Sequence, residues 1–113
     1  QAGTTLDLEE TTGLAQRTFS GNTTQVTLID VSATAVTAAA GGHKVYIRNT
    51  GTDKTKGFKV FLADAADDVE EIGTLFGQDW MLMPWLATNA TEDIMVQPSS
   101  AEKMTIEYAV FHQ

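Results

Sequence analysis

Short runs of β-favouring residues, separated by polar turns, dominate the chain from residue 24 to its end. Lys44–Asn49 is the clearest run, because Val45 and Ile47 alternate with polar or amphipathic side chains, as in a strand with one buried face. Turn residues recur roughly every eight to twelve residues, and no stretch keeps the 3.6-residue period of a helix. This pattern predicts one all-β domain, an antiparallel β-sandwich that is jelly-roll-like or immunoglobulin-like.

The same signals place the remaining elements. Thr50–Gly57 is polar with a glycine near each end, which predicts a loop between strands, and Gly77-Gln78-Asp79 predicts a turn. The acidic stretch Ala63–Glu71 is expected to form a helical turn or a loop. The other expected strands are Thr24–Val31, Thr34–Thr37, Phe58–Leu62, Ile72–Phe76, Trp80–Leu86, Asp93–Gln97 and Met104–His112.

The first 20 residues follow neither a two-residue nor a 3.6-residue period, and their apolar side chains are irregularly spaced. We therefore expect residues 1–20 to be an N-terminal extended arm and residues 21–113 to be the β-sandwich domain. The arm is either a loosely attached leader or a segment that becomes ordered against a neighbouring subunit, with Leu6 and Leu8 as anchors. A chain of 113 residues has room for a single core.

The charge balance argues against nucleic acid as a partner. The chain has 15 acidic and 7 basic residues, a formal net charge of -8, and would mostly repel a phosphate backbone. It contains no cysteine, which removes disulfides, thiolate nucleophiles and sulfur metal ligands. No apolar run approaches the ~18 residues of a membrane span. We expect neither nucleic acid nor a membrane as a partner.

The run Trp80–Leu86 is apolar at every position. A strand with one wet face should alternate, so this run indicates a strand covered on both faces. One interpretation is a central strand buried between two layers. Pro84 favours the other, an edge strand covered by another chain, because proline cannot donate to a ladder and prefers edges. The predicted interface consists of Trp80, Met81, Met83, Pro84, Trp85 and Leu86, together with Leu6 and Leu8.

Charged side chains form two groups in the middle of the chain. We interpret them as solvated loop surfaces, because exposed ion pairs contribute little to stability. The alternative is electrostatic complementarity between neighbouring subunits. The bases are Lys44, Arg48, Lys54, Lys56 and Lys59, and the acids are Asp64, Asp67, Asp68, Glu70 and Glu71.

Signals for chemistry are weak throughout. The stretch Asp64–Glu71 lacks the alternating ligands and central glycine of a calcium loop. His43 and His112 have no partner at a recognisable spacing, and nothing in the sequence brings together the carboxylates of Asp30, Asp79 and Glu107. We expect no catalytic residue, no cofactor and no metal ligand, and hence a protein that is not an enzyme.

Five segments occur in an order that resembles a known group of proteins. The chain is similar over about residues 24 to 113 to small structural proteins of tailed bacteriophages, of the capsid decoration (cement) type. Gln78 departs from that group's plain Gly-Asp turn. The segments are Lys44–Asn49, Ile72–Trp80, Met83–Trp85, Ile94–Val96 and Ile106–Phe111.

The resemblance implies a structural virion protein that decorates and stabilises a phage capsid from its surface, through contacts with the major capsid protein or other virion proteins. On symmetry grounds we expect a homo-oligomer, a dimer or a trimer. The alternative is a carbohydrate- or receptor-binding module of a phage tail or fibre, in which Trp80, Trp85 and Tyr46 stack on sugar rings. A third hypothesis is that the chain is a small hydrolase.

Overall fold

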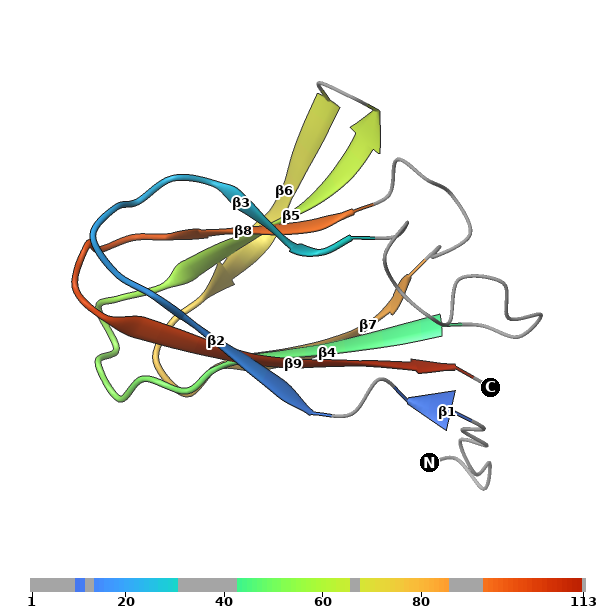
Figure 1. Cartoon of the computed structure of the whole chain (residues 1–113), viewed down its shortest axis with the longest axis horizontal. Coiled ribbons are helices and arrows are strands. Elements are labelled where there is room, and N and C mark those ends of the chain that lie inside the picture. Colours follow the sequence, from blue (N-terminus) through green and yellow to red (C-terminus); the bar gives the residue numbers. More distant parts are fainter. Residues whose placement is uncertain (1–9, 12–13, 31–42, 66–67, 86–92, 113) are drawn as a thin grey trace.

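The computed structural model describes residues 10–11, 14–30, 43–65, 68–85 and 93–112. Every regular element among these residues is a β-strand, and the strands form two antiparallel sheets (Figure 1). The part of the chain that the structure describes has no helix long and apolar enough to cross a membrane. The predicted fold class, an antiparallel all-β sandwich, is confirmed.

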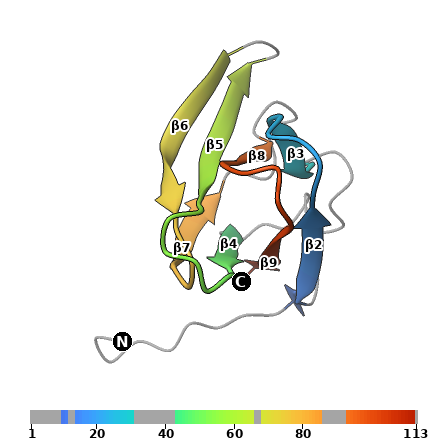
Figure 2. The same cartoon turned by 90° about the vertical axis from the view of Figure 1, so that its left-hand side faces the viewer.

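The first sheet is built around the C-terminal strand. β9 (Met104–His112) pairs along its length with β4 (His43–Asn49), which in turn pairs with β7 (Trp80–Trp85). On its other side, β9 pairs with the short β1 (Glu10–Thr11) and with β2 (Ala15–Phe19). β2 and β7 therefore lie on opposite sides of this sheet (Figure 2).

The second sheet has the order β3-β8-β5-β6. β8 (Ile94–Pro98) and β5 (Phe58–Ala65) are its central strands, whereas β3 (Val26–Ile29) and β6 (Asp68–Leu75) form its edges. Its ladders are less regular than those of the first sheet. The register shifts between Thr27 and Ile29 in β3, and twice along the β5–β6 pair.

The hydrophobic core lies between the two sheets and follows the two-residue period of their central strands. Val45 and Ile47 of β4 are completely buried, as are Ile94 and Val96 of β8. Aromatic packing adds to this layer: the rings of Phe19 and Phe58 lie 5.4 Å apart between centroids and are tilted by 59°. Removing these side chains from water is the main force that holds the sheets together.

β4 and β9 lie where the sequence predicts them, as do the 50–57 loop between β4 and β5 and the turn between β6 and β7. The predicted strand Thr34–Thr37 lies outside the described residues, and the strand expected at Thr24–Val31 is shorter, as β3. The described residues between Ala63 and Glu71 form neither a helical turn nor a loop, so that prediction is wrong for them. They belong to the β5–β6 hairpin, where Ala63 pairs with Val69 and Phe61 with Glu71. The sequence does not show the alternation of a strand here, because Glu70 and Glu71 are consecutive and both exposed, beside a register shift in the β5–β6 pair.

Part of the predicted N-terminal arm lies within the sandwich. Ala15–Phe19 is β2 and pairs along β9, and Phe19 is buried in the core. The sequence gives no strand signal here because Gln16, Arg17 and Thr18 are all exposed, which hides the alternation. Leu6 and Leu8 lie outside the described residues.

Asn49 is the principal buried polar residue at the end of β4, with 2% of its surface exposed. Its side-chain Nδ2 donates to the carbonyls of Lys56, at 3.1 Å, and Leu75, at 2.9 Å. Its Oδ1 accepts the backbone N–H of Gly51 at 3.0 Å. One side chain thus connects the first sheet, the 50–57 loop and the end of β6.

Asn49→Ala should destabilise the fold by about 2–4 kcal/mol, since it leaves two carbonyls and one N–H without their partner in a buried site. Chemical denaturation followed by tryptophan fluorescence would measure the loss. Thr52→Ala, in the exposed part of the same loop, is the matched control and should change the free energy of unfolding by less than about 0.5 kcal/mol. Equal stability of the two variants would contradict this role for Asn49.

Candidate protein-binding face

β7 is the last strand of the first sheet, and its side chains alternate between the core and the outside. Met81, Met83 and Trp85 pack against the core, and Trp85 is only 5% exposed. Trp80, Leu82 and Pro84 point outward; Trp80 is 64% exposed and Leu82 is 51% exposed. The strand is thus covered by its own core on one face, while its other face is open among the described residues.

The predicted interface residues on β7 therefore lie on both of its faces. Trp80 and Pro84 lie on the open face, and Met81 and Met83 are partly buried beneath it. Trp85 belongs to the core, so a contact of its ring with another protein is not available in this fold. Leu86, Leu6 and Leu8 lie outside the described residues.

β4 and β9 continue the open face of β7 across the sheet. The outward residues of these strands are neighbours by register, with Arg48 opposite Trp80 and Tyr46 opposite Leu82. Tyrosine, tryptophan and arginine are the residue types enriched at protein-binding hot spots. We call this surface the outer face; its residues are Lys44, Tyr46, Arg48, Trp80, Leu82, Pro84, Glu107 and Phe111. Ala109 is directed to the same side by register but is buried.

A hydrogen bond across the sheet fixes the centre of the outer face. The hydroxyl of Tyr46 donates to Oε1 of Glu107 at 2.9 Å. Burial, followed by this hydrogen bond and the charge of the carboxylate, raises the pKa of Tyr46 above its ordinary value of 10.0, and Arg48 opposes the shift. The tyrosine is therefore a neutral donor held in one orientation at physiological pH.

The turn before β7 determines where Trp80 begins the strand. Gln78 has a positive φ of 73°, and its backbone N–H donates to the carbonyl of Asn49. Its side-chain Nε2 donates to the carbonyls of Thr50 and Gly51 at 3.0 and 2.9 Å, and its Oε1 accepts from Arg48 at 2.5 Å. The residue that departs from the plain Gly-Asp turn is thus the one that joins this turn to β4.

Two further contacts hold the same turn against the 50–57 loop. Asp79 accepts the N–H of Phe76 through Oδ2, and Lys54 donates to the carbonyl of Gly77 at 2.6 Å. A Cβ atom at position 77 would lie 2.5 Å from the carbonyl oxygen of Asp53, so only glycine fits this approach. The start of β7 is consequently rigid, and the outer face is preformed.

Lys56 and Lys59 form ion pairs within the fold. Lys56 lies 2.6 Å from Glu102 and 3.7 Å from Asp53, and Lys59 lies 3.9 Å from Glu71. The hydrogen bond to Glu102 is the main cause that raises the pKa of Lys56. These pairs are accessible to solvent and contribute little to stability. The interpretation as loop surfaces is wrong for most of the charged residues, since Lys44, Arg48, Lys59, Glu70 and Glu71 lie on strands.

The candidate catalytic groups have structural roles where they are described. Glu107 binds Tyr46, and Asp79 caps the turn before β7. His43 is buried at the start of β4, in register with Trp85. Within the described ranges no three His, Cys, Asp or Glu residues come together as they would around a metal ion.

The proposed sugar-stacking set does not come together. Trp80 and Tyr46 share the outer face, but Trp85 points to the opposite side of β7. The three rings named for the carbohydrate-binding alternative therefore do not lie on one face of the sheet.

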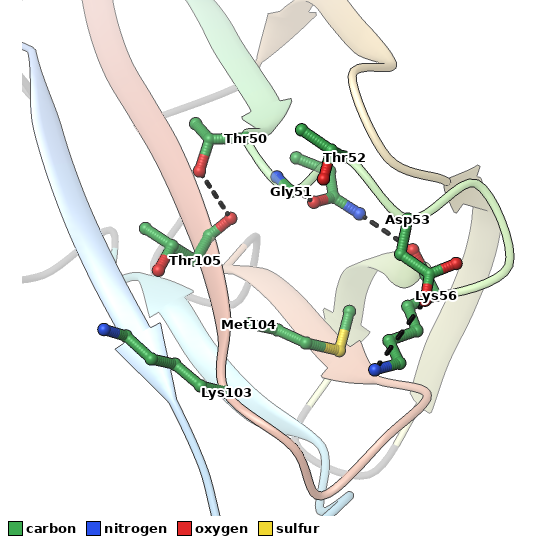
Figure 3. A pocket seen from close by; sticks show the side chains of 9 residues that line it. Thr50, Gly51, Thr52, Asp53, Lys56, Lys103, Met104 and Thr105 are labelled. Atoms are coloured by element: carbon green, nitrogen blue, oxygen red, sulfur yellow. Dashed lines mark hydrogen bonds and ion pairs between the residues drawn. The ribbon is translucent and has the colours of Figure 1, made fainter.

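A hollow of about 330 Å³ lies between the 50–57 loop and the beginning of β9 (Figure 3). Its polar groups largely bind one another: Thr50 Oγ1 donates to the carbonyl of Thr105 at 3.1 Å, and Asn49 donates to that of Lys56. The side chain of Lys103 extends away from Lys56 (Figure 3). Because these groups are already satisfied, the hollow does not define a ligand site.

Comparison with known proteins does not assign this chain to a family. No family model and no curated protein matches the sequence. A periplasmic lysozyme inhibitor of g-type lysozyme from Aeromonas hydrophila is similar in structure, with a TM-score of 0.47 and 23% identity over 89% of this chain and 85% of that chain. A Yersinia pseudotuberculosis-derived mitogen has a TM-score of 0.48 and 12% identity over 92% of this chain and 86% of that chain. Similarities this low transfer neither protein's activity.

We predict that the hydroxyl of Tyr46, which is bonded to Glu107, loses its proton at a higher pH than an ordinary tyrosine does. The difference in absorbance between the native chain and Tyr46→Phe isolates this group, whose pKa should lie above the ordinary value of 10.0. Glu107→Gln should lower the pKa, because the carboxylate charge no longer opposes the phenolate. Because folding raises the pKa of Tyr46, the protonated hydroxyl and its bond to Glu107 stabilise the fold at pH values below the pKa of Tyr46 in the unfolded chain. This stabilisation is lost as the pH rises through the pKa of Tyr46 in the folded chain. An unchanged titration in Glu107→Gln would show that Glu107 does not control Tyr46.

Proposed function

We propose that the chain is a structural virion protein that decorates and stabilises the capsid of a tailed phage by binding a shell protein through its outer face. The observation that carries the proposal is β7, where Trp80 and Leu82 remain 64% and 51% exposed on a rigid sheet. The resemblance of residues 24 to 113 to phage decoration proteins supports the choice of partner. The chain has no catalytic role in this proposal.

The energetics favour a protein partner for this surface. Burying apolar area contributes about 25 cal/mol per Å², from which the cost of ordering is subtracted. That cost is small here because the turn and the Tyr46–Glu107 bond already hold the outer face in place. Many copies on a symmetric shell would add avidity to a weak individual contact.

The charges of the outer face also suit a contact that excludes water. The hydroxyl of Tyr46 is bonded to Glu107 and Nη2 of Arg48 is bonded to Gln78, so both groups have a partner before binding, whereas Nε of Arg48 is buried without one. Glu70 and Glu71, by contrast, lie on the edge strand of the other sheet. The net charge of -8 therefore keeps the chain soluble without placing excess acid on the outer face.

Trp80→Asp should weaken binding to phage particles that lack the protein by about tenfold or more, because it places a charge in the centre of an apolar contact. Cosedimentation of the purified variant with such particles measures this. Ile72→Asp is the matched control: Ile72 is 46% exposed on β6 of the other sheet, so its replacement should leave binding unchanged.

Position 85 is unsuitable for this test, since Trp85 is buried and a charge there would disrupt the core. If Trp80→Asp binds as well as the native chain while remaining folded, the outer face is not the docking surface. If both aspartate variants lose binding equally, the docking surface is not confined to the first sheet.

A further inference from the structure

β7 differs from the other edge strands in how little protects its open side. β2 carries the exposed Arg17, and β6 carries Glu70 and Glu71. β3 is short, is interrupted by a register shift, and accepts at Thr27 O a hydrogen bond from the guanidinium of Arg17. Charges, prolines, bulges and short length are among the means by which proteins prevent edge strands from pairing. β7 has only the proline, Pro84, which lies near its end and leaves the N–H groups of Trp80 and Leu82 in place.

Two hydrogen bonds establish which backbone groups of β7 face the open side. Asn49 N–H donates to Asp79 O, toward β7, and Thr50 N–H donates to Thr105 O, toward β9. Backbone groups alternate in direction along an antiparallel ladder, so Ile47 and Val45 also face β7. Their register partners Met81 and Met83 face back toward β4.

The remaining residues of β7 therefore direct their backbone groups away from β4. Trp80 and Leu82 each present an N–H and a carbonyl on the open side, whereas Pro84 presents a carbonyl alone. Among the described residues no strand pairs with this side of β7. The same three residues carry the exposed side chains of the strand, so one partner could satisfy the backbone groups and cover the side chains together.

We propose that β7 pairs with β7 of a second copy of this chain, antiparallel about a two-fold axis that passes beside Leu82. In this register Leu82 of each copy exchanges two hydrogen bonds with Leu82 of the other. Each Trp80 N–H donates to the carbonyl of the opposite Pro84. The donor that proline lacks thus falls at the end of the ladder, opposite the carbonyl of Trp80.

Side chains in this register are complementary on both faces. On the outer face each Trp80 ring lies opposite the Pro84 ring of the other copy, and the two Leu82 side chains lie opposite each other. On the inner face Met81 lies opposite Met83, and both are only partly buried in a single copy. Every cross-strand pair is apolar.

Charge favours this edge over the acidic edge strand β6. Two chains that each carry -8 repel each other, so a stable contact must avoid acidic residues. Trp80–Trp85 contains no charged residue, whereas the edge strand of the other sheet contains Glu70 and Glu71. Pairing at β7 would join the two first sheets into one continuous sheet and place the two outer faces side by side. This inference does not depend on the proposed capsid role.

Two substitutions at one position separate strand pairing from ordinary side-chain contact. Leu82→Pro removes the N–H that faces the second copy but keeps an apolar side chain, and Leu82→Ala keeps the N–H but has a smaller side chain. Strand pairing predicts that Leu82→Pro weakens dimerisation by about a hundredfold and Leu82→Ala by about tenfold or less. Sedimentation equilibrium of the full chain measures both, and circular dichroism and thermal unfolding confirm that each variant folds.

A cross-linking experiment tests the register. The chain has no cysteine, so Leu82→Cys introduces a single thiol that faces its counterpart across the axis, and a short bis-maleimide, which forms a thioether with each thiol, should join the two copies. Gln16→Cys, exposed on β2 at the far side of the sheet, is the control and should not cross-link.

A monomeric native chain, or an alanine variant that dimerises less well than the proline variant, would overturn the inference. Dimers that cross-link equally at positions 16 and 82 would also overturn it. Particle binding by a monomeric chain would leave the capsid proposal standing and refute β7 pairing, with a strand of the shell protein as the occupant of this edge. Dimers that do not bind particles would leave β7 pairing standing and refute the capsid proposal.

Discussion

Complete burial of the inner face of β4 is the constraint on which the rest of this structure depends. Val45 and Ile47 face the second sheet and are inaccessible to water, and the strand has a neighbour on each side. Because side chains alternate, this burial directs Lys44, Tyr46 and Arg48 to the opposite face. Pairing with β7 in a fixed register then places Trp80 and Leu82 beside them. A shift by one residue would bury these side chains and expose the core.

The polar end of the sandwich maintains this register. Asn49 binds the 50–57 loop and the end of β6, while Gln78 binds the same loop from the turn before β7. Most of these bonds join side chains to backbone carbonyls, so they restrain the chain where ladder bonds are interrupted. The outer face is accordingly set by groups at its border as well as by the core beneath it.

Local alternation explains which parts of the fold could be predicted from the sequence. β4 and β9 are half-buried strands whose two-residue period is visible in the chain, and both were predicted at nearly their observed bounds. β2 and the first half of β6 carry no such signal because consecutive residues are exposed, and their strand structure comes from pairing with distant segments. The extent of β2 and β6 is a tertiary property that a local pattern does not contain.

The candidate site illustrates the same limit. The apolar run Trp80–Trp85 and its proline were enough to predict an edge strand. A run that is apolar at every position does not reveal which residues face the core, so Trp85 was assigned to the interface although it is buried. The contribution of Tyr46, Arg48 and Glu107 to the same face follows only from the register of three strands.

We propose above all that the outer face binds a shell protein on a phage capsid. The most direct test of this proposal is the copy number of the chain in phage particles purified from the native source on a density gradient, measured by quantitative mass spectrometry. A decoration role predicts that the chain migrates with intact particles at a copy number comparable to that of the major shell protein. Absence of the chain from those particles would contradict the claim.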